Sequence, residues 1–71
     1  MNKKMLNAIR NTKGRFFGLY TKQGEVLNAQ FRGESDQYLK VYDRNSKVDR
    51  RFAKTSVRGA SIGSTVFGKV K

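Results

Sequence analysis

The chain has 71 residues, 16 lysines and arginines against 5 acids, a formal net charge of +11, and neither cysteine nor histidine. A chain this short buries only about 60% of its unfolded surface, so we expect a single thin-cored domain spanning residues 1–71. The missing residue types exclude disulfides, thiolate metal sites and a histidine general base. We therefore expect no catalytic residue, no cofactor and no bound metal.

The longest apolar stretches are two or three residues long. They are too short for a secretory signal or a membrane span, and together with the absence of cysteine they favour a soluble protein of a reducing cytoplasm with no membrane partner.

The charge is distributed unevenly along the chain. Residues 1–24 and 50–71 each hold six cations and no acid, whereas residues 25–49 hold four cations and all five acids. So large an excess of one sign repels itself in a compact fold, and a bound polyanion relieves that repulsion. We expect DNA or RNA as the partner, and we expect the cations of both chain ends to share one surface.

Residues 2–11 predict a short helix. Asn2 can cap its N-terminus, and Met5, Leu6 and Ile9 fall on one face. A helix of this length is unstable alone, so its apolar stripe is expected to dock on a sheet. A helix lying on a membrane surface is the weaker alternative, because the stripe holds no aromatic residue.

The rest of the chain alternates as short strands do, over residues 15–22, 25–32, 37–53 and 57–62, with 37–53 forming a hairpin. A single helical turn is expected near Thr55 and Ser56, and residues 63–71 form either a last strand or a basic tail. Five short strands with glycine-bearing turns predict a mainly β fold, in which residues 15–62 close into a small five-stranded SH3-like barrel behind the N-terminal helix. An OB-type barrel is the alternative.

The hairpin carries the strongest functional signal. Leu39 and Val41 point to one side of its first strand, while Tyr38, Lys40 and Tyr42 point to the other. Cations neutralise phosphates and exposed tyrosines stack on bases, so aromatics interleaved with cations favour nucleic-acid binding. The predicted binding residues are Arg32, Tyr38, Lys40, Tyr42, Arg44, Lys47, Arg50, Arg51, Lys54 and Arg58, with Asn28 and Gln30 beside them.

Structural roles compete with this interpretation. Tyr38 and Tyr42 can pack across strands beneath the helix, and Arg50 and Arg51 can pair with acids across the turn, namely Asp43 and Asp49. Residues 33–36 are predicted to form a loop whose two acids repel phosphate, so the binding face is expected to lie away from it.

No base-reading motif or enzyme motif is visible. The run 59–64, GASIGS, lacks the spacing and the lysine of a phosphate-binding loop, and the serines have no histidine to activate them. The acid pairs of the turns stand beside lysine and arginine, where carboxylates are usually solvated and hold no metal. We expect a non-enzymatic binder that contacts phosphates with weak sequence preference.

Five short motifs resemble the small SH3-like β-barrel proteins of tailed bacteriophages and their bacterial relatives, a family of largely undefined function. The motifs are Gly14-Arg15-Phe16-Phe17, Lys22-Gln23-Gly24-Glu25, Val41-Tyr42-Asp43, Arg51-Phe52 and Ser56-Val57. Gln23 stands where that family more often has aspartate, and the tail from Gly63 is additional.

The resemblance implies a phage accessory protein acting in the bacterial host cytoplasm or nucleoid. It also implies an alternative partner, an acidic host protein such as a polymerase subunit or a nuclease, which this chain would inhibit or redirect. A homo-oligomer is compatible with either role.

Overall fold

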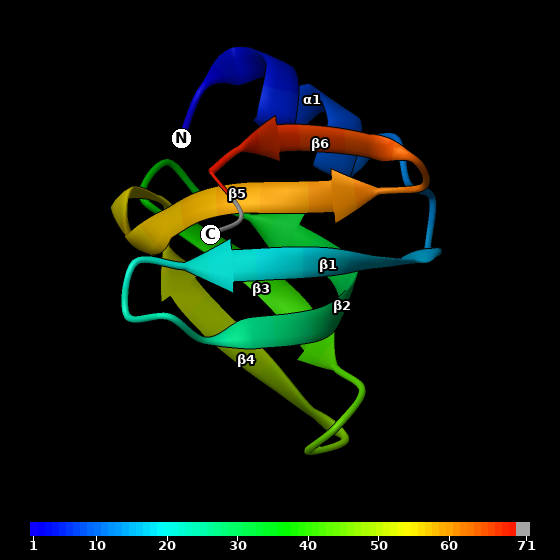
Figure 1. Cartoon of the computed structure of the whole chain (residues 1–71). Helices are drawn as coiled ribbons and strands as arrows, with labels where there is room; N and C mark the ends of the chain where they lie inside the picture. The colour runs from blue at the N-terminus through cyan, green and yellow to red at the C-terminus, as the bar shows by residue number, and fades with distance from the viewer. Residues whose placement is uncertain (70–71) are drawn as a thin grey trace.

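The computed structural model describes residues 1–69 as one short helix and a six-stranded antiparallel sheet of order β4-β3-β2-β1-β5-β6 (Figure 1). The mainly β prediction with an N-terminal helix is therefore confirmed. The elements are α1 (Lys3–Arg10), β1 (Phe16–Thr21), β2 (Val26–Glu34), β3 (Tyr38–Asp43), β4 (Val48–Ala53), the 3₁₀ turn η1 (Lys54–Ser56), β5 (Val57–Ile62) and β6 (Thr65–Gly68).

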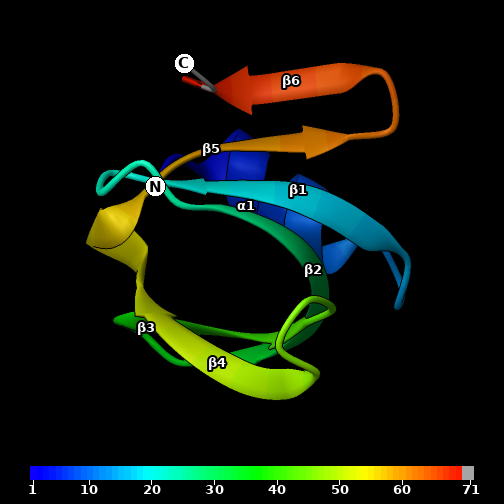
Figure 2. The same ribbon diagram turned by 60° about the horizontal axis from the view of Figure 1, so that its bottom comes forward.

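The sheet curls strongly but does not close, as Figure 2 shows from below. The predicted closed five-stranded barrel is therefore wrong. β5 pairs with β1 along one edge and with β6 along the other, so no edge of β5 remains for β4 to close against. Of the two alternatives for residues 63–71, a strand forms over Thr65–Gly68, and residues 70 and 71 lie outside the described residues.

Two glycines allow β6 to lie close to β5. A Cβ atom on Gly59 would stand 2.3 Å from the backbone oxygen of Lys69, and one on Gly68 would stand 2.3 Å from that of Arg58. Any side chain at either position would push the two strands apart, so glycine is required there.

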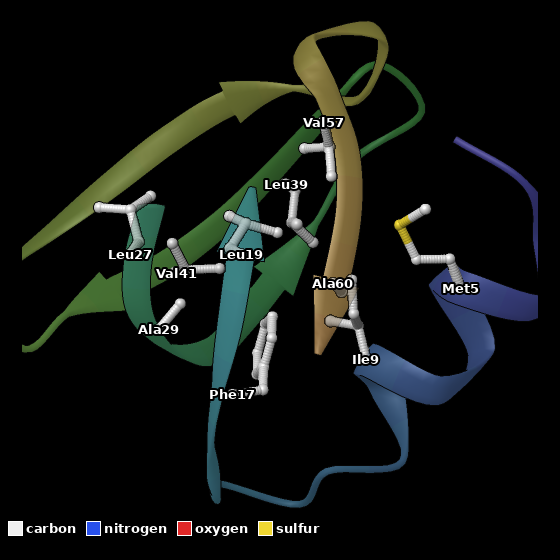
Figure 3. Close-up of a cluster of buried hydrophobic side chains, with 10 residues drawn as sticks. All are labelled: Met5, Ile9, Phe17, Leu19, Leu27, Ala29, Leu39, Val41, Val57 and Ala60. Carbon is white, nitrogen blue, oxygen red and sulfur yellow. The ribbon is translucent and has the colours of Figure 1, made fainter. Parts of the chain in front are cut away.

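Helix α1 forms where its cap predicts. The Asn2 side chain accepts a hydrogen bond from the backbone N–H of Met5 at 2.7 Å, and the helix ends one residue before the expected limit, at Arg10. Met5 and Ile9 are buried, and α1 packs against β5 and β6. Figure 3 shows both side chains on the helix beside β5. Within residues 1–69 no helix is long and apolar enough to cross a membrane.

The core consists of the inward side chains of the alternating strands, closed by the helix (Figure 3). Leu39 and Val41 are fully buried, as predicted for the inward row of the hairpin. In β1, β2 and β3 the core side chains are two residues apart, because successive side chains alternate between the two faces. In β5 Val57 and Ala60 are three apart, across the register shift between β1 and β5. The buried set is Met5, Ile9, Phe17, Leu19, Leu27, Ala29, Leu39, Val41, Val57 and Ala60.

A β-bulge extends β2 beyond its expected end. Phe31 pairs with Val41 but Gly33 pairs with Lys40, so one extra residue, Arg32, stands on the β2 side. The predicted loop 33–36 is therefore shorter, since Gly33 and Glu34 belong to the strand. A bulge changes which way later side chains point. Here it places Glu34 opposite the inward-facing residue of β3 instead of on the outer surface.

Candidate functional site

The outward side chains of β1 to β4 gather cations and aromatic rings on one surface, which we call the cation–aromatic face. Strand register builds it, since Phe16 pairs with Gln30, Gln30 with Tyr42, and Tyr42 with Asp49, which forms one row across four strands. Phe16 and Tyr38 are each 40% exposed. The face consists of Phe16, Arg32, Tyr38, Lys40, Tyr42, Arg44, Asp49 and Arg51.

An arginine lies over each of the three aromatic rings of the face, Phe16, Tyr38 and Tyr42. The guanidinium carbon lies 5.2 Å from the ring centroid for Arg44 over Phe16 and for Arg32 over Tyr42, and 4.7 Å for Arg51 over Tyr38. Such contacts contribute about 0.5–1 kcal/mol at exposed sites, enough to position a guanidinium without fixing it. Among residues 1–69, Arg44 and Arg51 form no ion pair with any acid.

Asp49 is the one acid of this face. Its carboxylate lies 3.7 Å from Nε of Arg32 and 3.8 Å from Nζ of Lys40, and all three side chains are about half exposed. Solvated pairs of this kind contribute about 0–1 kcal/mol. An incoming phosphate would meet little resistance in replacing the carboxylate.

Two shallow hollows flank Tyr38, which lines both of them. The smaller, of about 210 Å³, borders the cation–aromatic face at the β2–β3 turn and is lined by Gly33, Glu34, Ser35, Tyr38, Lys40 and Arg51. The larger, of about 320 Å³, lies beside η1 and is lined by Asp36, Gln37, Tyr38, Ala53, Lys54 and Thr55. The smaller hollow is below the range of roughly 300–1,000 Å³ typical of drug-sized ligands, so it has room for one small ring system.

Arg50 lies on the opposite side of the hairpin from Arg51, because its register partner is the inward-facing Val41. It donates to Glu25 at 2.6 Å and to Asp43 at 3.1 Å, so the suggested pairing with Asp43 is present. The Glu25 carboxylate, followed by Asp43, raises the pKa of Arg50. No pair between Arg51 and Asp49 occurs among the described residues.

Asp43 is buried, with 3% of its surface exposed. Burial by itself raises the pKa of this carboxyl, but hydrogen bonds from the backbone N–H of Asn45 and from Arg50 outweigh it, and the net pKa is below its usual value. The bond from Asn45 is 2.9 Å long. Asp43 and Arg50 therefore hold the turn end of the hairpin.

Lys54 is also held by an ion pair, in a cluster that joins three elements. Its Nζ lies 2.8 Å from Oε1 of Glu34, and Arg10 of α1 donates to the same oxygen at 2.7 Å and to Oε2. Hydrogen bonds from Arg10 first, and then from Lys54, lower the pKa of Glu34 to about 2. Glu34 is therefore a neutralised acid that ties helix, strand and 3₁₀ turn together, and does not repel phosphate as a free loop acid would.

The remaining predicted residues lie apart from the face. Lys47 is exposed in the β3–β4 turn with φ +59°, and Arg58 is half-buried on β5. Lys3 and Lys4 belong to α1, which packs on the inward side of the sheet, so the cations of both chain ends do not share one surface.

Sequence reasoning missed Phe16 as a member of the face. The adjacent pair Phe16 and Phe17 was the available signal, because alternation requires that one of two neighbouring strand residues point outward. Gln30, which was expected beside the binding row, donates its side-chain amide to the Gly14 carbonyl and supports the start of β1.

No protein-family model, curated protein or solved structure matches this chain. Within residues 1–69 no group of three or more metal-ligating side chains comes together. The interpretation of the cation–aromatic face therefore depends on its own chemistry.

Proposed function

We propose that this protein binds nucleic acid, without catalysing a reaction, through the cation–aromatic face. The observation that carries the proposal is that three outward rings each hold an arginine, with Lys40 among them, on one surface. Cations release counterions from phosphates, and aromatic rings stack on bases whatever their identity. Contacts of these two kinds give affinity with weak sequence preference.

The proposed contact residues differ from those expected from the sequence alone. Arg50 and Lys54 are engaged by carboxylates and are assigned structural roles, while Phe16 joins the set. The face then offers four cations against one weakly paired acid. A monomer of this kind binds non-specifically with Kd on the order of 10⁻⁴ to 10⁻⁶ M at physiological salt.

The resemblance to small SH3-like phage proteins supplies the proposed setting, an accessory protein acting in a bacterial host cytoplasm. Support for the SH3-like class comes from the five consecutive strands β1 to β5, which curl into one sheet with a 3₁₀ turn before β5. In that class, β6 is an addition that lies on the outer edge of β5.

A salt titration tests the proposal. Binding of labelled duplex and single-stranded oligonucleotides is measured by fluorescence anisotropy for the wild type and for the double variant Lys40→Gln/Arg51→Gln. Each lost phosphate contact lowers the salt slope by about 0.7 for single strands and about 0.9 for duplex. The double variant should therefore lose close to twice these values.

The matched control is Lys3→Gln/Lys4→Gln, which removes the same charge from exposed positions on α1. Its slope should stay near that of the wild type. An affinity that does not change with salt, or equal slopes for the two double variants, would contradict the proposal. A host protein that is still captured from lysate after nuclease has destroyed the nucleic acid would instead favour the protein-binding alternative.

A further inference from the structure

We infer that the cation–aromatic face selects an extended single strand, which passes from Phe16 of β1 to Tyr42 and then along β3 to Tyr38, with a separate base on each ring. The inference rests on the proposed function and adds to it the form of the nucleic acid and the path that it follows. The supporting observations are the spacing of the rings, the cations between them, and the hollow beside Tyr38.

The spacing of the rings excludes stacked bases. The centroids of Phe16 and Tyr42 are 6.3 Å apart and their planes meet at 61°, so bases that stack on the two rings cannot be parallel to each other. Tyr42 and Tyr38 are four residues apart on β3, which corresponds to roughly 13 Å of strand. Neighbouring bases in a B-form strand rise by only about 3.4 Å. A duplex also keeps both faces of its internal bases covered by neighbours. A separate base therefore reaches each ring only in an unstacked single strand.

The charges between the rings match the phosphates of such a strand. Lys40 lies midway between the two tyrosines on the same side of β3, and Arg32 stands beside it at the β2 bulge. Both cations share Asp49 at 3.7 and 3.8 Å. The sugar–phosphate chain between a base on Tyr42 and a base on Tyr38 would pass over these two cations.

The hollow of about 210 Å³ beside Tyr38 provides a place for the last base of this path. Tyr38 and Arg51 both line it, and guanidinium planes stack on bases as aromatic rings do. Glu34, also in the wall, is neutralised by Arg10 and Lys54, so its carboxylate presents no free negative charge to the strand.

The experiment compares single strands of about twelve nucleotides, within the range of known single-strand sites, with a duplex of equal phosphate number, at one fixed salt concentration. Deoxythymidine and uridine oligomers serve as separate arms, so that DNA and RNA are distinguished. The variants are Tyr38→Leu and its control Tyr20→Leu, because Tyr20 also points outward but its register partners, Val26 and Gly59, do not belong to the cation–aromatic face. Circular dichroism melting verifies that both variants fold.

We expect the single strand to bind more tightly than the duplex, and Tyr38→Leu to weaken single-strand binding at least about fivefold, the lower end for one base–aromatic stack. Duplex binding and the Tyr20→Leu variant should change little. Equal binding of duplex and single strand, with Tyr38→Leu equal to Tyr20→Leu, would overturn the inference while salt-dependent binding kept the proposed function intact. Absence of binding to any oligonucleotide at low salt would overturn both.

Discussion

Arg50 and Arg51 are neighbours in sequence, yet they belong to two chemically different regions of the molecule. Arg50 faces the inner side of the hairpin, where it donates to two carboxylates at 2.6 and 3.1 Å. Arg51 faces the outer side, where it lies over the Tyr38 ring and contacts no acid among the described residues. The difference shows that the side of the sheet, more than the residue type, decides whether a cation holds the fold or is available to a ligand.

The same contrast separates the other cations. Arg10 and Lys54 enclose Glu34 where helix, sheet and 3₁₀ turn meet, whereas Arg32 and Lys40 share Asp49 at longer, solvated distances. The shortest ion pairs therefore involve the inner cations, and the outer face keeps an excess of positive charge. Variants on the inner and the outer side of the sheet should therefore have different effects.

Replacing Glu34 by glutamine should have one of the two largest effects on folding. The hydrogen bonds from Arg10 and Lys54 become weaker and uncharged, and we expect a loss of about 1–2 kcal/mol in the free energy of unfolding after allowance for solvent screening. Urea denaturation measures the loss. Asp36→Asn is the control, since Asp36 forms no ion pair among residues 1–69, and it should be nearly neutral.

The pH dependence of stability tests the same carboxylate, through the wild type and Glu34→Gln. Glu34 has a pKa of about 2 in the folded chain and an ordinary value of 4.5, so the stabilisation is complete above about pH 4.5 and is lost as pH falls towards 2. Wild type should lose stability across this window, and Glu34→Gln should lose less. Parallel stability curves for the wild type and Glu34→Gln between pH 5 and 2 would contradict the role given to this carboxylate.

Replacing Arg50 or Arg51 by glutamine should affect different properties, stability for Arg50 and binding for Arg51. Arg50→Gln leaves the buried Asp43 without its guanidinium partner and should cost about 1–2 kcal/mol of stability while leaving the salt slope of binding unchanged. Arg51→Gln should cost at most about 0.5–1 kcal/mol, from its contact with Tyr38, but should lower the single-strand slope by about 0.7.

Denaturation and salt titration of both variants test this contrast. The sequence alone predicted that both arginines bind nucleic acid, which would make two phosphate contacts, whereas the contacts in the structure limit the expected loss to one. Loss of slope in Arg50→Gln would show that its ion pairs open on binding.

The smallest expected effect is a gain in affinity for nucleic acid. Asp49→Asn removes the one acid of the cation–aromatic face and releases Arg32 and Lys40, so nucleic-acid affinity should rise by up to about fivefold, the range of a solvated ion pair. Anisotropy titration at low salt measures it. In a Lys40→Gln background the gain should shrink, because one of the two released cations is absent. An equal gain in both backgrounds would mean that Asp49 acts only through its long-range charge.

Much of the fold could be predicted because its signals are local. The Asn2 cap, the alternation that buries Leu39 and Val41, and the turn of the hairpin each depend on residues a few positions apart. The closed barrel was a wrong prediction because closure depends on which strand takes the free edge of β5, and four residues of the tail, Thr65–Gly68, take it.

The part of the candidate site that depends on local alternation was also predicted. Tyr38, Lys40 and Tyr42 share an outward row that alternation alone predicts, and the structure adds Phe16 from a strand two positions away in the sheet. Arg50 and Lys54 are assigned to structural pairs by acids that lie far away in sequence. Glu25 is 25 residues from Arg50, and Glu34 is 20 residues from Lys54.

By itself the sequence determined the charge, the element types and, within regular stretches of strand, which residues share a side, since these follow from composition and from the two-residue period of a strand. Only the tertiary structure decided which cation meets which acid and which ring receives an arginine. Those contacts depend on strand register, and one extra residue at the β2 bulge is enough to turn Glu34 inward and leave Arg32 on the face.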